Sequence, residues 1–263
     1  MTIQERVHAG RPMAFWAKPP SFKVLGVPIS AIDPRKAIEA IEAWIEARDP
    51  TYVCITGVHG VIECGRDEAL RRIHEEAGMV TPDGMPLVWV AHSRGLSAVQ
   101  RVYGPELMLK LSARAATTGR RHFYYGGAEG VADELKQRLQ ALFPGLEVVG
   151  TLTPPFRPMT PEEDAATVAR INQARPDILW VGLSTPKQER WMSSHRSRLE
   201  VPVMVGVGAA FDFLSGRKRQ APEWMRRSGL EWLFRLLSEP RRLYRRYLVI
   251  IPTFMFRILF DKR

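Results

Sequence analysis

The stretch from Pro176 to Met192, PDILWVGLSTPKQERWM, constrains the fold most, because it joins a buried strand to a helix through a tight turn. Residues 178–181 form an apolar run that is long enough for a buried strand and too short for a helix. Thr185, Pro186 and Gln188 then form a helix-start pattern, with threonine as the cap and proline at the first helical position. This order places polar groups at the carboxyl edge of a parallel sheet, where open α/β folds bind ligands. The same pattern also fits a capping box in which Gln188 merely satisfies a backbone N–H.

Further strand–turn–helix units of this kind precede and follow the stretch. Their strand-like segments are short apolar runs that end at turn residues, at positions 52–56, 79–80, 122–125, 147–149 and 203–207. Strands that alternate with helices of 10–15 residues indicate a mostly parallel sheet flanked by helices. We therefore expect an α/β protein, with a short strand pair around Gly26 ahead of the sheet.

The positive charge of the chain is concentrated near its end. The net charge is +10, and residues 217–263 hold thirteen basic against four acidic residues, a balance of +9. A charge confined in this way is typical of a surface that meets a polyanion or an anionic membrane. We predict three parts: a flexible leader over residues 1–20, a core over 21–216, and a basic, aromatic, helical appendage over 217–263.

The appendage combines arginines with aromatic residues. Arg235, Arg242 and Arg245 are spaced by seven and three, so they share one helical face if the helix tolerates Pro240. Tryptophan and tyrosine among arginines are typical of a helix that lies on anionic lipid, although a core helix with a charged outer face shows the same pattern. The apolar run over 247–260 is interrupted by a proline and an arginine and is shorter than the ~20 residues of a spanning helix.

The rest of the chain favours a reducing compartment. The two cysteines, Cys54 and Cys64, have no zinc-binding or redox spacing, and no apolar secretory segment is visible near the start of the sequence. We therefore expect a cytoplasmic protein that attaches to the membrane peripherally.

Two charged residues are the candidates for chemistry. Asp83 follows a short strand within a Thr-Pro-Asp-Gly turn, where an aspartate serves either a ligand or the turn conformation itself. Arg101 precedes a predicted helix and can offer a bidentate fork to phosphate, or simply lie on the surface. His59 lies between two turn glycines, where a packing or capping role is the simpler interpretation.

Several motifs that would define other enzyme classes are missing. The glycines after the strands do not complete G-x-G-x-x-G, a phosphate-binding P-loop is absent, and no paired aspartates or histidine–carboxylate clusters are present. We therefore expect no metal and no cofactor. If a diphosphate leaves in the reaction, arginines have to carry the charge that a divalent cation would otherwise neutralise. A nucleotide-dependent oxidoreductase of Rossmann type and a basic nucleic-acid-binding protein remain as alternatives, although we expect no nucleic-acid partner.

Six segments in order carry a resemblance to a known family. They are Thr81–Met85, Arg101–Met108, Phe123–Gly127, Gly182–Glu189, Gly206–Gly216 and the tail segment Trp232–Arg242. Together, from about Val24 to Tyr247, they resemble the WecG/TagA/CpsF glycosyltransferase family. The resemblance implies a Rossmann-like enzyme at the cytoplasmic membrane face. Such an enzyme moves a hexose from a UDP-sugar to a polyprenyl-diphosphate-linked sugar in cell-surface polysaccharide synthesis, with inversion and without a metal.

The resemblance also implies roles for individual residues. Asp83 would be the general base, and Arg235, Arg242 and Arg245 would bind the diphosphate. The substrates would contact residues at the strand ends and in the turns, namely Thr56, Gly57, His59, Gly84, Arg101, Gly126, Gly127, Gly182, Lys187, Gln188 and Glu189. Relatives usually carry asparagine near Gly57, so the identity of the sugar is open. The implied partners are the UDP-sugar, the lipid-linked sugar, an anionic membrane surface and a possible second copy of the chain.

The residues themselves are compatible with this chemistry. An inverting transfer is a single displacement, which needs one carboxylate to take the proton of the acceptor hydroxyl and a cationic cradle for the leaving diphosphate. Asp83 can supply the first, and Arg101 with the tail arginines can supply the second.

Overall fold

The central feature of the molecule is a parallel sheet. The computed structural model describes residues 18–260, apart from the side chains of Arg227, Arg242, Arg245 and Arg246. Within this range the main sheet has six strands, in the order β4-β3-β8-β7-β5-β6, and every neighbouring pair is parallel. The strands are β3 (Thr51–Thr56), β4 (Met79–Pro82), β5 (Arg121–Gly126), β6 (Glu147–Leu152), β7 (Ile178–Gly182) and β8 (Val203–Gly206). This arrangement confirms the predicted α/β class.

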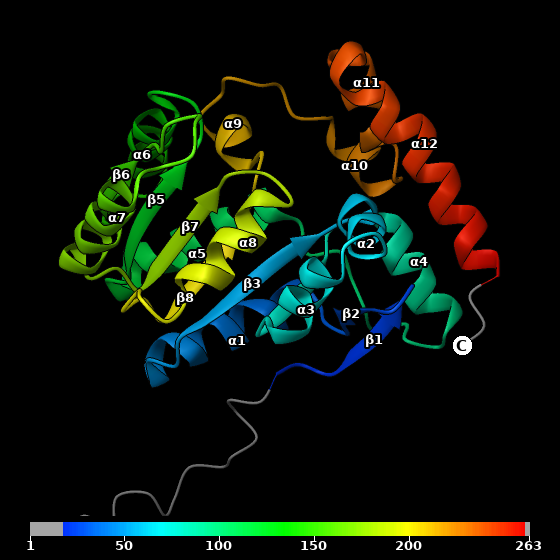
Figure 1. Ribbon diagram of the computed structural model, residues 1–263, viewed down its shortest axis with the longest axis horizontal. Coiled ribbons are helices and arrows are strands. Elements are labelled where there is room, and N and C mark those ends of the chain that lie inside the picture. The colour runs from blue at the N-terminus through cyan, green and yellow to red at the C-terminus, as the bar shows by residue number, and fades with distance from the viewer. Residues whose placement is uncertain (1–17, 261–263) are drawn as a thin grey trace, which may run out of the picture.

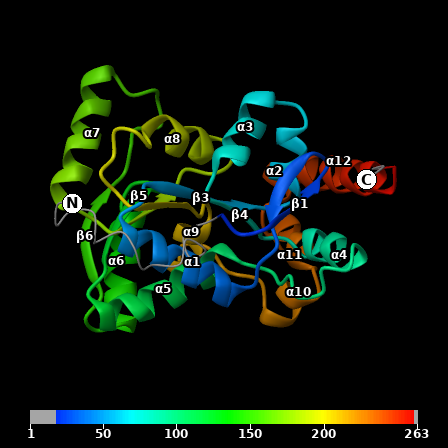
Figure 2. The same ribbon diagram turned by 90° about the horizontal axis from the view of Figure 1, so that it is seen from below.

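Helices cover both faces of the sheet (Figures 1 and 2). Seen from below, α2 (Val58–Cys64), α3 (Glu68–Glu76), α7 (Pro161–Ala174) and α8 (Lys187–His195) lie on one side. On the other side lie α1 (Pro34–Ala47), α5 (Gly104–Thr118) and α6 (Val131–Leu142). Two further helices, α4 (Met85–Ser93) and the short α9 (Ala210–Leu214), follow β4 and β8.

Successive residues of a strand pack into two different hydrophobic cores, one on each face of the sheet. Ile178 and Trp180 of β7 belong to the core under α1, α5 and α6, whereas Leu179 and Val181 belong to the core under α2, α3 and α8. A strand that is covered on both faces has no solvent-facing residue, which explains why the sequence shows unbroken apolar runs instead of alternation. The same burial makes this sheet a rigid frame for the loops that leave it.

Local sequence signals fix several element boundaries. Asp33 accepts a hydrogen bond from the backbone N–H of Lys36 and caps α1, and Thr160 and Glu163 form a reciprocal capping box at α7. A two-residue turn at Leu25 and Gly26 has positive φ at both positions and joins the antiparallel strands β1 (Ser21–Val24) and β2 (Val27–Ser30). This hairpin was predicted. Of the predicted leader, residues 1–17 lie outside the described range.

The C-terminal helices pack against the core next to α2. They are α10 (Glu223–Arg227), α11 (Glu231–Ser238) and α12 (Pro240–Leu259), and α12 lies beside α2 (Figure 1). Ile250 and Phe254 of α12 join the core under α2, with Phe254 only 1% exposed. Among the described residues no helix is both long and apolar enough to cross a bilayer.

One expectation about this region is wrong. Residues 231–247 do not form one continuous helix, because α11 ends at Ser238 and Pro240 starts α12. Proline lacks the N–H that a continuing helix needs at this position, but it fits the first turn of a new one. Arg235 therefore lies on α11 and Arg242 and Arg245 on α12, so their spacing does not place them on one helical face.

Candidate active site

The loops at the carboxyl ends of the parallel strands enclose a cavity of about 830 Å³. Residues 57–60 follow β3, residues 83–86 follow β4, residues 182–185 follow β7 and residues 207–211 follow β8, and all of these segments line it. The C-terminal helices close the cavity from the side with Glu231, Trp232 and Arg235. A crevice beyond the carboxyl ends of the strands is the usual ligand site of an open α/β sheet.

Asp83 lies in this cavity directly after β4. Its backbone N–H donates to the carbonyl oxygen of Thr56, 3.0 Å away, so the turn is tied to the end of the neighbouring strand β3. Its Oδ1 is buried and has no hydrogen-bond partner among the described residues. Burial raises the pKa of Asp83 to about 6, against the opposing effect of the charge on Arg101. The result is a carboxylate with an unused acceptor and the basicity expected of a general base.

Arg101 lies beside Asp83 and is held on three sides. Its Nε donates to the carbonyl oxygen of Asp83, and its Nη1 donates to the carbonyl oxygen of Arg226 at 3.2 Å. Its Nη2 is 2.6 Å from Oε2 of Glu231 and 3.7 Å from Oδ1 of Asp83. The guanidinium also lies over the ring of Tyr103, at 4.2 Å from the ring centre. The arginine is therefore a fixed positive charge in the cavity wall, as its place before α5 indicated.

Of the three tail arginines that were predicted to bind the diphosphate, Arg235 is the one with a described side chain, and it lines the cavity. Its guanidinium lies 5.6 Å from the ring centre of Phe213, on the segment after β8. The side chains of Arg242 and Arg245 lie outside the described part of the structure. Trp232 and Tyr247, with ring centres 6.0 Å apart, complete the aromatic lining that α11 and α12 contribute.

The turn after β7 differs from the predicted capping box. Helix α8 starts at Lys187 and has no side-chain cap, and Thr185 instead donates to Oε1 of Glu189 at 2.9 Å. Gln188 is 2% exposed, donates from Nε2 to the same oxygen at 3.1 Å, and keeps Oε1 without a partner among the described residues. Gln188 thus offers an acceptor to the cavity rather than capping its own helix.

The comparison with known proteins agrees with this geometry. The model of the "Glycosyl transferase WecG/TagA/CpsF family" matches residues 22–263. The chain belongs to the WecG/TagA/CpsF glycosyltransferase family. Similar proteins include the N-acetylglucosaminyldiphosphoundecaprenol N-acetyl-beta-D-mannosaminyltransferases of Staphylococcus aureus strains MW2, NCTC 8325 and COL. Each is 26% identical to this chain over 265 aligned residues, which cover 100% of the chain and 98% of the relative.

Most of the predicted site residues of this glycosyltransferase line one cavity. Those that line it, besides Asp83, Arg101, Gln188 and Arg235, are Gly57, His59, Gly84, Gly127, Gly182 and Lys187. Gly57 has a particular position, because a Cβ added to it would lie 3.9 Å from Oδ2 of Asp83 with no other heavy atom near it. The space beside the carboxylate is therefore open to a substrate.

Three predicted substrate-binding residues lie behind the wall of the cavity instead. Thr56 is 2% exposed, and its hydroxyl is 3.2 Å from Nε2 of His74. Glu189 is fully buried. Gly126 adopts φ +123°, and a Cβ there would lie 2.6 Å from the carbonyl oxygen of Gly182, so glycine permits the close approach of β5 and β7. Each supports the lining, and none of them reaches the cavity surface.

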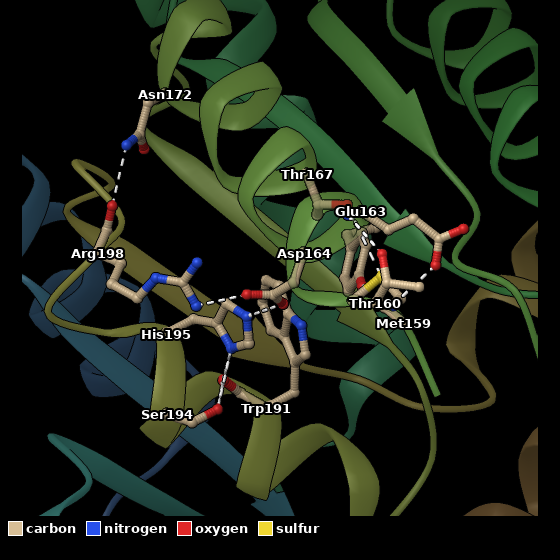
Figure 3. A network of polar contacts seen from close by, with 11 residues as sticks. Met159, Thr160, Glu163, Asp164, Thr167, Asn172, Trp191, Ser194, His195 and Arg198 are labelled. Carbon is tan, nitrogen blue, oxygen red and sulfur yellow. Dashed lines mark hydrogen bonds and ion pairs between the residues drawn. The ribbon is translucent and has the colours of Figure 1, made fainter. Parts of the chain in front are cut away.

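A network of polar contacts stabilises the far wall of the glycosyltransferase site (Figure 3). Asp164 of α7 accepts from Nε2 of His195 at 2.7 Å and from Arg198 at 2.5 Å. His195 stacks on Trp191, which stacks on Tyr125 in turn, and both of these aromatic residues line the cavity. The network joins α7 to α8, and because Trp191 and Tyr125 are part of the stack, it fixes their rings in the wall.

The serine, histidine and aspartate of this network do not form a hydrolytic triad. Nε2 of His195 bonds to Asp164, while its Nδ1 lies 2.8 Å from the carbonyl oxygen of Trp191 and 3.0 Å from the hydroxyl of Ser194, which donates to that same carbonyl. The serine hydroxyl is engaged with a backbone carbonyl, and none of Ser194, His195 and Asp164 lines the cavity, so a substrate there cannot reach the serine. The contacts in Figure 3 are structural.

Several lining residues were not predicted from the sequence. Tyr125 lies in an apolar run that indicates only burial, Trp191 lies among the polar residues of a helix, and residues 154–159 lie in a loop without any chemical motif. Glu231 is one acid in a basic tail, and no pattern in the sequence links it to Arg101. Within residues 18–260 no three His, Cys, Asp or Glu side chains gather in a way that could hold a metal ion.

Proposed function

We propose that this protein transfers a hexose from a UDP-sugar to a polyprenyl-diphosphate-linked sugar, by a single inverting displacement without a metal ion. The family membership supports glycosyl transfer as the reaction class. The observation that carries the mechanism is the carboxylate of Asp83, which lines the cavity next to the guanidinium of Arg101 and whose Oδ1 has no hydrogen-bond partner among the described residues. The relatives act on N-acetylglucosaminyldiphosphoundecaprenol, which supports a lipid-linked acceptor in the synthesis of a cell-surface polymer.

In this mechanism Asp83 accepts the proton of the acceptor hydroxyl as that oxygen attacks the anomeric carbon of the donor. The bond from the anomeric carbon to the diphosphate oxygen breaks in the same step, and UDP leaves. A buried carboxylate with pKa near 6 is largely ionised at pH 7 and still more basic than an exposed aspartate, as general-base catalysis requires.

Arg101 and Arg235 supply positive charge to the leaving diphosphate, and we assign the same role to Arg242 and Arg245 on α12. Charge that is already fixed before the reaction stabilises the developing anion without reorganisation. Gln188 accepts a hydrogen bond from a hydroxyl or amide of the sugar, because its Nε2 is directed to Glu189 and its Oε1 is not. No cofactor takes part in this scheme.

The identity of the hexose depends on the space beside Asp83. Gly57 leaves that space open, so the cavity accepts a substituent where a longer side chain would lie. An N-acetylmannosamine-type donor, as the names of the relatives state for their own reaction, and a glucose-type donor are the two candidates.

We place the protein at the cytoplasmic face of the membrane, held there by α12. Leu248, Phe256 and Leu259 are 63%, 64% and 77% exposed, and they lie on the side of α12 opposite to the buried Leu243, Ile250 and Phe254. An apolar face on a helix with arginines in its first turns is typical of an interfacial helix on anionic lipid. This placement brings the cavity close to the lipid-linked acceptor.

A donor screen tests the proposal directly. Purified protein is mixed with a short-chain lipid-diphosphate sugar and one UDP-sugar at a time, and the release of UDP is measured. We expect release that depends on both substrates with one or two UDP-hexoses. Release without acceptor would indicate a hydrolase, and no release with any UDP-sugar would contradict the proposed donor class.

A further inference from the structure

Besides the packing of α12 on α2, the C-terminal part of the chain meets the core at a short segment, residues 101–106. Gln220 donates to the hydroxyl of Tyr103 at 2.9 Å, and Arg226 forms an ion pair with Glu106 at 2.6 Å. Arg101 donates to the carbonyl oxygen of Arg226. The arginine of the site therefore lies where the tail docks, and its surroundings depend on both parts of the chain.

Glu231, the first residue of α11, makes the shortest of these contacts to Arg101. Its Oε2 is 2.6 Å from Nη2 of Arg101, and the two side chains are only 13% and 16% exposed. The same nitrogen is 3.7 Å from Oδ1 of Asp83. Nη2 thus lies between two carboxylates and bonds to the one from the tail.

We propose that Glu231 is a positioning residue, which holds the guanidinium of Arg101 away from a close pair with the carboxylate of Asp83 and so keeps that carboxylate available as a base. The inference rests on the proposed transfer reaction, in which Asp83 is that base. An arginine beside a single buried carboxylate tends to form a close, charge-assisted pair with it. Such a pair would occupy the oxygen of Asp83 that the acceptor hydroxyl needs.

Electrostatics point in the same direction. The charged groups that act on Asp83 are Arg101 before α5 and Glu231 and Arg235 on α11, together with the backbone N–H of Gly104. Both arginines and this N–H lower the pKa of Asp83, whereas Glu231 raises it. Glu231 therefore opposes the two cations that the diphosphate requires, and the base keeps its proton affinity.

The variant Glu231→Gln tests this role with little change of shape. We expect the acid limb of kcat/KM to move to lower pH by about 1 unit, because an unopposed cation near a carboxylate lowers its pKa by about 1–3 units. We also expect kcat to fall by about tenfold or more, because Arg101 then occupies the base. Glu231→Asp keeps the charge and is expected to retain the acid limb of the wild type.

Glu106→Gln is the matched control. It removes the other carboxylate of the docking segment that pairs with a tail arginine, also at 2.6 Å, but Glu106 does not line the cavity. We expect an unchanged acid limb in this variant. If Glu231→Gln and Glu106→Gln alter kcat and the pH profile equally, Glu231 only fastens the tail and the inference is wrong.

A second measurement separates this inference from the proposed function. The pH dependence of unfolding is compared between each protein and its Asp83→Asn derivative, which gives the pKa of Asp83 without any turnover. We expect a lower value in the Glu231→Gln background than in the wild type. An unchanged value in a protein that transfers sugar would overturn the role of Glu231 and leave the reaction standing. A lowered value in a protein that shows no transfer would leave the contact standing and refute the reaction.

Discussion

At the scale of single residues, the burial of Asp83 costs folding stability and also makes its carboxylate a stronger base. Asp83 has a pKa of about 6 in the folded protein against an ordinary value of 3.8, so folding disfavours its ionised form. The contribution of Asp83 to the stability of the folded state is therefore fully present below pH 4, and it is lost as the pH rises through about 6. A residue that destabilises the fold at neutral pH is typical of a functional site.

Asp83→Asn should separate the two effects. We expect turnover to fall by roughly 10²–10⁴-fold, the usual range for loss of a general base. Above pH 6 we expect the variant to be more stable than the wild type by about 1–3 kcal/mol, the shift converted to free energy and reduced because 31% of the side chain is exposed. The two would converge below pH 4. Chemical denaturation at pH 4 and pH 8 measures this, and near-normal turnover would show that Asp83 is only a turn residue.

Gly57→Ala and Gly57→Asn probe the space beside the base. The backbone there is extended, with φ −103°, so either residue fits without strain, and we expect a loss of stability below about 1 kcal/mol. The new side chain lies next to Oδ2 of Asp83 and narrows the cavity. We expect the ratio of kcat/KM between two UDP-hexoses to change by tenfold or more with asparagine and less with alanine. An unchanged ratio would place the sugar elsewhere in the cavity.

At the scale of elements, the apolar runs in the sequence made the strands of the core predictable. The helices of the tail were harder to predict, because their ends depend on tertiary contacts. Strands such as β7 are visible in the sequence as short apolar runs, because both of their faces are buried. The hairpin at Gly26 and the helix caps follow from local backbone chemistry. The break at Pro240 was not decided by sequence, since the residue fits either a kinked helix or the start of a new one.

The same distinction applies to the site. Asp83 and Arg101 were predictable because strand ends and helix starts meet at one edge of a parallel sheet. Thr56 and Glu189 were expected to contact the substrates, but they are buried behind the cavity wall. Neighbouring residues at a strand or helix end point in different directions, and the sequence does not reveal which one faces the cavity. Glu231 could not be found, since its contact with Arg101 joins residues 130 positions apart.

Replacement of Leu248, Phe256 and Leu259 by serine tests the exposed face of α12. These side chains are free of the core, so we expect the free energy of unfolding to change by less than about 1 kcal/mol. Binding to vesicles that contain anionic lipid should weaken by at least tenfold, because apolar burial and charge act together there. Co-sedimentation measures the binding. Leu142→Ser, which removes one exposed leucine of α6, serves as the control, and equal losses in both proteins would exclude a membrane role for this face.

At the scale of the whole molecule, we assign to the positive charge of the protein the role that a metal ion would otherwise have. The net charge of +10 lies almost entirely in the chain after Gly216, and the helices formed there bring Arg235 to the cavity. Of the carboxylates that line the cavity, Glu231 pairs with Arg101 and Asp212 pairs with Lys218, and Asp83 lies 3.7 Å from Nη2 of Arg101. Among the described residues they do not gather as metal ligands. The neutralisation of a diphosphate is thus assigned to the protein itself.

Transfer should therefore persist in excess EDTA. We expect the rate to stay within about twofold of the untreated enzyme, because fixed guanidinium groups already stabilise the leaving group. The measurement is UDP release before and after chelation, with magnesium and manganese added back separately. A rate that disappears with chelator and returns with either ion would contradict an arginine-based cradle.

The position of β8 has a consequence for how the protein reaches its active form. This strand is the last of the main sheet in the chain, yet it lies between β3 and β7 and pairs with both. Until it inserts, the half of the sheet that carries Asp83 and the half that carries Gln188 have no common frame. Contacts between such distant segments form slowly and late in folding. Refolding should therefore restore ligand binding in one step, together with the final protection of β3 from hydrogen exchange, and no folding intermediate should bind the donor.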